Sequence, residues 1–208
     1  PGGELTLAAV EPALAAAAAR DVLAIGPGLG ESEEAREAAR RIVLGTLCPT
    51  VLDADAINAF AGRARELRAR RAPTVLTPHA GEMGRLLGTS AQQVLDDRLG
   101  ALAEAVEATA CFVVLKGHQT LIGVPAGRVT VNPTGNPGMA SGGMGDALTG
   151  MVAAFLGQKL GPEMACRLAV YLHGLAGDLA LAAGDELCLS ASDLLAALPE
   201  ACRRLRSL

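Results

Sequence analysis

A glycine-rich segment ahead of an apolar helical pattern is the part of this sequence best suited to chemistry. Gly142, Gly143 and Gly145 directly precede a helix predicted over Ala147–Leu156, and Asp146 stands at its start. The first N–H groups of a helix lack partners within the helix and lie at the positive end of its dipole, so the segment predicts a phosphate site. Asp146 is then either an N-cap or a general base beside the phosphate. The many glycines favour the base, since a cap alone does not require them.

Three further segments follow apolar runs that are typical of buried strands. Gly26–Gly30 is either a close approach of the backbone to a ligand or a tight turn into a helix. Thr77–Glu82 is a turn with an isolated histidine, which is ordinarily solvated. Lys116–Thr120 begins with a lysine that is either a surface charge or a point charge for phosphates. Because ligands bind beyond the carboxyl ends of parallel strands, at one edge of the sheet, these segments together predict one site.

The elements that must position these residues follow from apolar runs bounded by Gly, Pro or Asp. Strands are predicted at 21–26, 50–53, 73–77 and 111–116, and helices at 14–20, 31–44, 55–70, 80–87 and 91–109. A hairpin is predicted from 120–124 and 128–132 around the turn 125–127, followed by helices at 147–156, 162–183 and 192–205. Short apolar strands alternating with helices predict an α/β fold with a parallel sheet covered on both faces.

Composition and missing motifs exclude several classes of function. The 208 residues carry a net charge of −4 and no Trp, which argues against partners such as nucleic acid or an anionic membrane. No apolar run reaches the roughly 18 residues of a membrane span, and the first residues do not resemble a signal peptide. Five cysteines without a Cys-x-x-Cys pair predict reduced thiols and a cytoplasmic location. The three histidines share no ligand-like spacing, so no metal site built by the protein is expected.

Five blocks of sequence carry a resemblance to a known family. They are AIGPGLG (24–30), LDADAIN (52–58), LTPHAGEMGRLLG (76–88), LKGHQTLI (115–122) and NPTGNPGMASGGMGDALTG (132–150). Together they resemble the ADP- or ATP-dependent NAD(P)H-hydrate dehydratases, relatives of ribokinase, over nearly the whole chain. Gly-x-Gly-Asp alone is typical of ribokinase-like enzymes in general, whereas the full wording of the last block resembles the hydrate dehydratases in particular. The resemblance implies one domain, residues 1–208, with a ribokinase-like three-layer αβα sandwich and a mostly parallel central sheet.

The resemblance also implies a reaction and its residues. The terminal phosphate of ADP or ATP passes to the C6 hydroxyl of hydrated NADH or NADPH, and phosphate is then expelled to restore NAD(P)H. Asp146 would take the hydroxyl proton, and Mg²⁺ would be held chiefly by phosphate oxygens. The implied hydrate-binding residues are Gly28, Gly30, Pro78, His79, Glu82 and Asp146. The implied nucleotide-binding residues are Lys116, Gly117, His118, Gln119, Thr120, Ser141, Gly142, Gly143 and Gly145.

The sequence departs from the family in one respect. We expect it to lack the Gly-rich strand–helix region with which the dehydratase domain normally begins. The resemblance further implies a homo-oligomer and functional pairing with an NAD(P)H-hydrate epimerase. Two alternatives stay open. One is a vitamin-precursor kinase of the same fold, such as a hydroxyethylthiazole or hydroxymethylpyrimidine kinase. The other is a nucleotide-binding module without catalysis.

Overall fold

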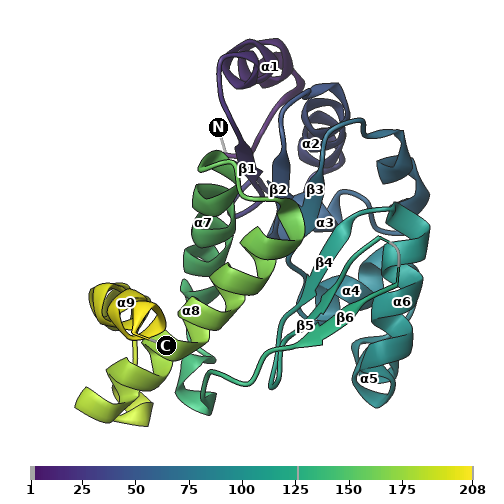
Figure 1. Cartoon of the computed structure of the whole chain (residues 1–208). Coiled ribbons are helices and arrows are strands. Elements are labelled where there is room, and N and C mark those ends of the chain that lie inside the picture. The colour runs from purple at the N-terminus through teal and green to yellow at the C-terminus, as the bar shows by residue number, and fades with distance from the viewer. Residues whose placement is uncertain (1–2, 126, 208) are drawn as a thin grey trace.

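The computed structural model describes residues 3–125 and 127–207, in which six strands form one sheet. The strands follow the order of the chain from one edge of the sheet to the other (Figure 1). The first four are parallel: β1 (Leu23–Ile25), β2 (Thr50–Leu52), β3 (Thr74–Leu76) and β4 (Phe112–Leu115). The antiparallel hairpin of β5 (Leu121–Gly123) and β6 (Val129–Val131) completes it. Ala126, in the predicted turn of this hairpin, lies outside the described residues.

Helices cover both faces of the sheet, as Figure 1 shows. On one side lie α2 (Glu33–Gly45), α3 (Ala54–Asn58), α4 (Ala80–Leu87), α5 (Ala91–Asp96) and α6 (Arg98–Thr109), with α1 (Val10–Ala18) packed on α2. The other side has α7 (Met144–Gly157) and α8 (Pro162–Ala183), and α9 (Ala191–Arg206) packs on α8. Short 3₁₀ turns occur at Leu7–Ala9, Ala64–Ala69, Pro137–Met139 and Glu186–Cys188. The α/β fold, a three-layer αβα sandwich, is confirmed.

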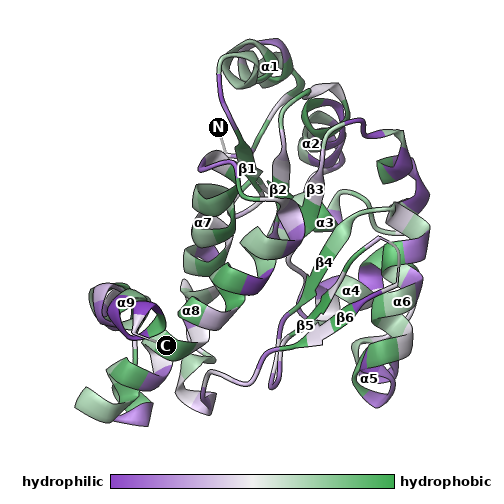
Figure 2. Cartoon of the chain, in the orientation of Figure 1, coloured by the Kyte–Doolittle hydropathy of each residue, from purple (hydrophilic) through white to green (hydrophobic). Residues whose placement is uncertain are grey.

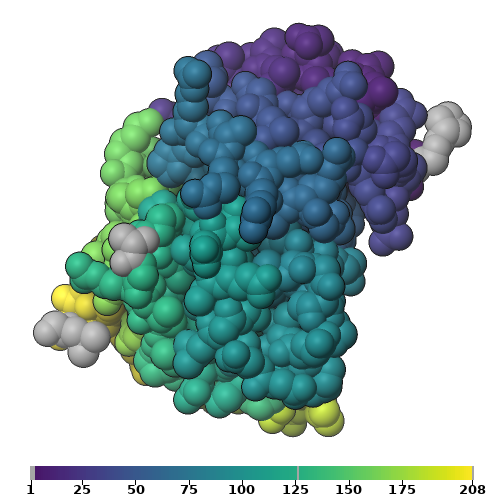
Figure 3. Space-filling view, turned by 90° about the vertical axis from the view of Figure 1, so that its right-hand side faces the viewer, coloured from purple at the N-terminus to yellow at the C-terminus, as the bar shows by residue number. Residues whose placement is uncertain are grey.

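The core is aliphatic and lies on both faces of the sheet. Successive side chains of a strand point to opposite faces, so Val51 packs in the cluster of α7 and α8, whereas Leu52 packs in the cluster of α2 and α3. Figure 2 shows hydrophobic residues along β4 and over much of α7. Figure 3 shows the right-hand side of the view in Figure 1, where the surface is formed mainly by the first part of the chain, coloured purple to teal. Among the described residues, none of the helices combines the length and apolar composition required to cross a bilayer.

Several predicted element boundaries are wrong for reasons visible in the backbone. The helix predicted at 55–70 ends at Asn58, and Gly62 turns the chain with φ +67° before the 3₁₀ segment. The helix predicted at 91–109 breaks at Asp97, which ends α5 with φ −138° and ψ 74° and whose side chain caps α6 through the N–H of Gly100. The helix predicted at 147–156 starts earlier, at Met144.

Candidate active site

A pocket of about 600 Å³ opens where the β4–β5 connection faces the glycine-rich segment and α8. One wall is Lys116–Thr120, and another is Asn132–Gly145, of which most residues line it. Val170, His173 and Gly174 of α8 form its inner side. The predicted site residues that line it are His79, Lys116, Gly117, His118, Gln119, Thr120, Ser141 and Gly145. The structure thus brings the β4–β5 connection and the glycine-rich segment to one cavity.

The other predicted site residues lie outside the walls of this pocket. They are Gly28, Gly30, Pro78, Glu82, Gly142, Gly143 and Asp146. Pro78 is buried, and its carbonyl accepts a hydrogen bond from the backbone N–H of Lys116 at 2.8 Å. Gly28 and Gly30 belong to the β1–α2 connection, where the N–H of Gly30 donates to Asp55 Oδ2 at 3.1 Å. Gly28 has φ +74°, and an added Cβ would meet nothing within 4 Å. Its left-handed backbone conformation, and not a lack of space, therefore favours glycine at this position.

The start of α7 has the geometry of an anion site. Gly143 is the N-cap, with φ +83°, and no side chain caps this helix end. In the described part of the chain, the backbone N–H groups of Gly145 and Asp146 have no protein acceptor. Asp146 stands exposed on the first turn and is not the N-cap, so the capping alternative is wrong. Two unpaired donors and a free carboxylate therefore meet at the positive end of a 14-residue helix.

The glycine-rich segment is held against α8 by close backbone approach and by one carboxylate. A methyl group at Gly174 would overlap Thr134, and one at Gly177 would overlap Met139. Asp178 accepts from the N–H of Gly135 at 2.9 Å and from Asn136 Nδ2 at 3.0 Å. These contacts determine where the segment lies in relation to the sheet.

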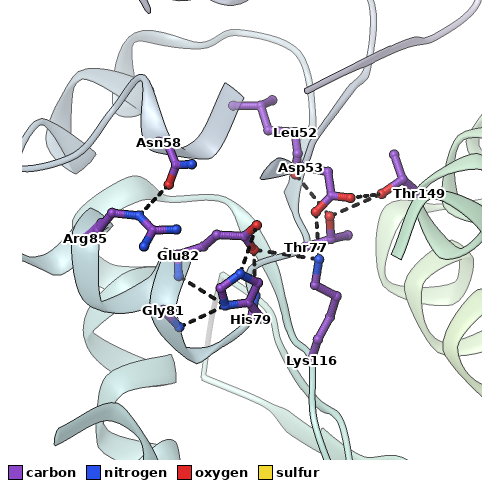
Figure 4. A network of polar contacts seen from close by, with 10 residues as sticks. All are labelled: Leu52, Asp53, Asn58, Thr77, His79, Gly81, Glu82, Arg85, Lys116 and Thr149. Atoms are coloured by element: carbon purple, nitrogen blue, oxygen red, sulfur yellow. Dashed lines mark hydrogen bonds and ion pairs between the residues drawn. The ribbon is translucent and has the colours of Figure 1, made fainter. Parts of the chain in front are cut away.

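A partly buried ion pair lies between the strand ends and the start of α7 (Figure 4). Lys116 Nζ is 2.8 Å from Asp53 Oδ1 and 3.6 Å from Glu82 Oε2. The other oxygen of Asp53 accepts from Thr149 Oγ1 of α7 at 2.9 Å. A Cβ at Gly145 would lie 3.4 Å from Lys116 Nζ, so the absence of a side chain there leaves the ammonium beside the helix start. Lys116 is thus not a freely extended point charge, because a carboxylate 2 % exposed holds it in place.

His79 and Glu82 form the start of α4. His79 is the N-cap: its Nδ1 accepts from the N–H of Gly81 at 2.9 Å, while Glu82 Oε2 accepts from the N–H of His79 at 2.7 Å. This reciprocal capping explains why the helix predicted at 80–87 begins at Ala80, and Gly88, with φ +74°, ends it. The imidazole is 54% exposed and lines the pocket, whereas Glu82 is turned inward toward Lys116.

Sequence reasoning missed two polar residues of the site. Asp53 ends a predicted strand and lies in the block LDADAIN (52–58), but it is not among the predicted site residues, although an acid that ends an apolar strand at the ligand edge is itself a signal. His173 lies on an apolar helix that offers no such signal. Its Nε2 is 2.9 Å from the carbonyl oxygen of Met144 at the start of α7, and burial lowers the pKa of the imidazole. In the described segments, no group of three or more His, Cys, Asp or Glu side chains is arranged to hold a metal ion.

Comparison with known proteins agrees with these features. A family model described as NAD(P)H-hydrate dehydratase matches residues 4–200. The chain belongs to the NAD(P)H-hydrate dehydratase family. A bifunctional NAD(P)H-hydrate repair enzyme from Moorella thermoacetica, a relative in this family, is 45% identical over 205 residues. That alignment covers 99% of this chain and 39% of the Moorella protein, so the chain spans well under half the length of that relative.

Solved structures place the same dehydratase family in the ribokinase-like fold. The ADP/ATP-dependent NAD(P)H-hydrate dehydratase of Bacillus subtilis, co-crystallised with ATP and Mg²⁺, superimposes with a TM-score of 0.81 at 36% identity. The match covers 92% of this chain and 69% of the Bacillus chain. A ribokinase-like superfamily protein from Enterococcus faecalis matches with a TM-score of 0.77 at 31% identity, covering 95% of this chain and 68% of its own. The predicted ribokinase-like architecture is thereby confirmed.

Proposed function

We propose that this chain carries out the nucleotide-dependent dehydration of the S form of hydrated NADH and NADPH, a metabolite-repair reaction. The observation that carries the proposal is the start of α7, where unpaired backbone donors, Lys116 and the exposed Asp146 lie beside the pocket, in a chain of the hydrate dehydratase family. The nucleotide, ADP or ATP, occupies the pocket between Lys116–Thr120 and the glycine-rich segment. The hydrate lies on the neighbouring edge, next to Gly28 and His79.

The proposed chemistry asks the protein mainly to position groups and to stabilise charge. Asp146 accepts the proton of the C6 hydroxyl as the hydroxyl oxygen attacks the terminal phosphorus of the nucleotide. The bond between that phosphorus and the bridging oxygen of the nucleotide breaks. The N–H groups of Gly145 and Asp146, with Lys116 beside them, stabilise the phosphoryl oxygens. The ring nitrogen then donates its electron pair as the C6–O bond breaks. Loss of a proton from C5 restores the dihydropyridine, and AMP and phosphate are the products when ADP is the donor.

Mg²⁺ fits this site as an ion carried by the nucleotide. Hard cations of this kind prefer oxygen ligands and retain several waters, so phosphate oxygens and waters would chiefly hold the ion. The backbone N–H donors at the start of α7 and the ammonium of Lys116 would hold the phosphates that carry it, and Asp146 stays available as the proton acceptor. When bound, the ion supplies neutralisation of the developing phosphate charge.

The partners and the location are also proposals. The relatives named bifunctional repair enzymes support pairing with an NAD(P)H-hydrate epimerase. Val129 and Val131 are 45% and 51% exposed on the edge strand β6, which supports self-association through that edge. All five cysteines are free thiols, which supports a reducing compartment such as the cytoplasm. Light scattering of the purified protein tests self-association, and a monomer at all concentrations would contradict it.

The test of the dehydratase function uses hydrated NADH with Mg²⁺ and either ADP or ATP. Recovery of the dihydropyridine absorbance, with release of free phosphate, is the expected result. No recovery with either nucleotide would contradict the proposal. Release of a stable phosphorylated alcohol would instead indicate a vitamin-precursor kinase, which the family match does not favour. Nucleotide binding without turnover would indicate a binding module.

A further inference from the structure

The loop of residues 117–120, which forms one wall of the pocket, has backbone angles that are unfavourable without support from other residues. Gly117 has φ +143°, and Gln119 has φ +52°, a left-handed conformation that side chains other than glycine rarely adopt. Such a conformation persists only when surrounding contacts determine it. The contacts that hold this loop therefore decide the shape of the proposed nucleotide site.

One guanidinium provides three of those contacts, beside the hydrogen bond that Thr120 Oγ1 donates to the carbonyl oxygen of Gly117 at 3.0 Å. Arg98, the first residue of α6, donates from Nη1 to the carbonyl oxygen of His118 at 2.5 Å. Its Nη2 donates to the carbonyl oxygens of Gln119 at 3.4 Å and Leu115 at 3.5 Å. A Cβ at Gly117 would stand 3.4 Å from the same Nη2, so the guanidinium also packs against the bend itself. One planar, permanently charged group thus gathers three carbonyls from the end of β4 and the loop after it.

These bonds also determine where the N–H groups of the loop point. In a planar trans peptide the C=O and the following N–H point in opposite directions. With the carbonyl of His118 turned toward Arg98, the N–H group of Gln119 points away from it. Within residues 3–125 and 127–207 this N–H group has no protein acceptor, and Gln119 lines the pocket. The chain from Gly117 to Thr120 forms a turn that directs the N–H group of Thr120 back toward the carbonyl of Gly117. The N–H group of Gln119 is therefore a free donor for a ligand on the pocket side.

We propose that Arg98 is a positioning residue for nucleotide binding: by holding the carbonyls of His118 and Gln119, it turns the N–H group of Gln119 toward the nucleotide. Arg98 does not line the pocket and acts through the loop. This inference rests on the proposed function, because it takes ADP or ATP as the ligand. Lysine cannot replace it fully, since an ammonium lacks the planar fork that reaches several carbonyls at once.

The experiment compares Arg98→Ala and Arg98→Lys with a matched control, Arg68→Ala. Like Arg98, Arg68 donates to a backbone carbonyl, but that carbonyl belongs to Glu107 near the C-terminal end of α6 and not to the nucleotide loop. Calorimetry measures ADP and ATP binding, and hydrogen exchange reports the order of residues 117–120. We expect Arg98→Ala to weaken nucleotide binding about 10-fold to 100-fold and to speed hydrogen exchange in the loop. The affinity and exchange rate of Arg98→Lys should lie between those of the wild type and Arg98→Ala. Arg68→Ala should bind nucleotide as the wild type does.

Two further readouts separate positioning from a general loss of structure. In the dehydratase assay Arg98→Ala should raise the KM for nucleotide more than the KM for the hydrate, and millimolar methylguanidinium should restore part of its nucleotide affinity. Wild-type affinity in Arg98→Ala, or an equal loss in Arg68→Ala, would overturn this inference and leave the proposed function standing. A wild-type protein that binds neither ADP nor ATP would overturn both.

Discussion

Replacing Asp53 by asparagine should destabilise the protein strongly, although the change removes only a charge. The carboxylate is 2% exposed and lies 2.8 Å from Lys116 Nζ, which is itself only 19% exposed. Removing one partner of a buried ion pair costs about 3–5 kcal/mol, because the other charge stays buried and uncompensated. Glu82, 3.6 Å from the ammonium, remains, and an asparagine oxygen still accepts from Thr149, so we expect the lower end, about 3 kcal/mol. For a chain of this length that corresponds to a loss of roughly 6–12 °C in Tm.

The assay is urea unfolding followed by circular dichroism, with Asp21→Asn as the matched control. Asp21 also pairs with a lysine, Lys159, but both side chains are about two-thirds exposed, at 68% and 70%. Exposed pairs contribute little, so the control should leave the unfolding midpoint unchanged. The double variant Asp53→Ala/Lys116→Met should be more stable than Asp53→Ala alone, because the ammonium is then no longer left without its nearer carboxylate, and Glu82 keeps the hydrogen bond from the N–H of His79. Equal midpoints for Asp53→Asn and Asp21→Asn would refute the reasoning.

Three other predictions concern the start of α7, the helix behind it and the thiols. Asp146→Asn should lower the dehydration rate by roughly 10²–10⁴ with nearly unchanged nucleotide affinity in calorimetry, and an unchanged rate would exclude a proton-accepting role. Burial lowers the pKa of His173, so below the ordinary pKa of about 6.5 the unfolded chain takes up a proton more readily than the folded one, and the free energy of unfolding falls as the pH decreases. Between pH 7.5 and 5.5, urea unfolding should show a smaller fall in this free energy for His173→Gln than for the wild type. An identical fall in both proteins would contradict this. Burial raises the pKa of Cys111 to about 11 and of Cys166 to about 12. A thiol reagent should therefore modify the exposed Cys188 in the native protein, and Cys111 and Cys166 only after unfolding. Rapid labelling of Cys111 or Cys166 in the native protein would contradict their burial.

The sequence predicts the layers of the fold well because the signal for each element is local. A fully buried parallel strand reads as a short apolar run, and β2 and β3 have that pattern in the residues around Val51 and Val75. The helix 80–87 is predicted with correct bounds, since His79 and Glu82 cap its start and Gly88 ends it in a left-handed conformation. The break at Asp97 was missed because helical propensity on either side of it is uninterrupted, whereas a single backbone angle decides whether two helices or one form there.

The candidate site is harder to predict, because its contacts join residues far apart in the chain. Asp53 meets Lys116 across 63 positions and Thr149 across 96. Periodicity places each of these residues on an element but does not state which side chains will face each other. Arg98 illustrates the same limit: it belongs to a helix without a predicted role, and only the path of the loop after β4 brings three carbonyls to it.

The glycines on α8 restrict how this protein can be engineered. Exchanging glycine for alanine inside a helix is a common route to higher thermal resistance, worth roughly 1 kcal/mol in a helix interior. At Gly174 and Gly177 the added methyl groups would meet Thr134 and Met139, so the same exchange would push the glycine-rich segment off the helix. Designers seeking a hardier variant should therefore leave these two positions alone and choose glycines whose surroundings are open, such as Gly150 on α7, where an added methyl group meets nothing within 4 Å.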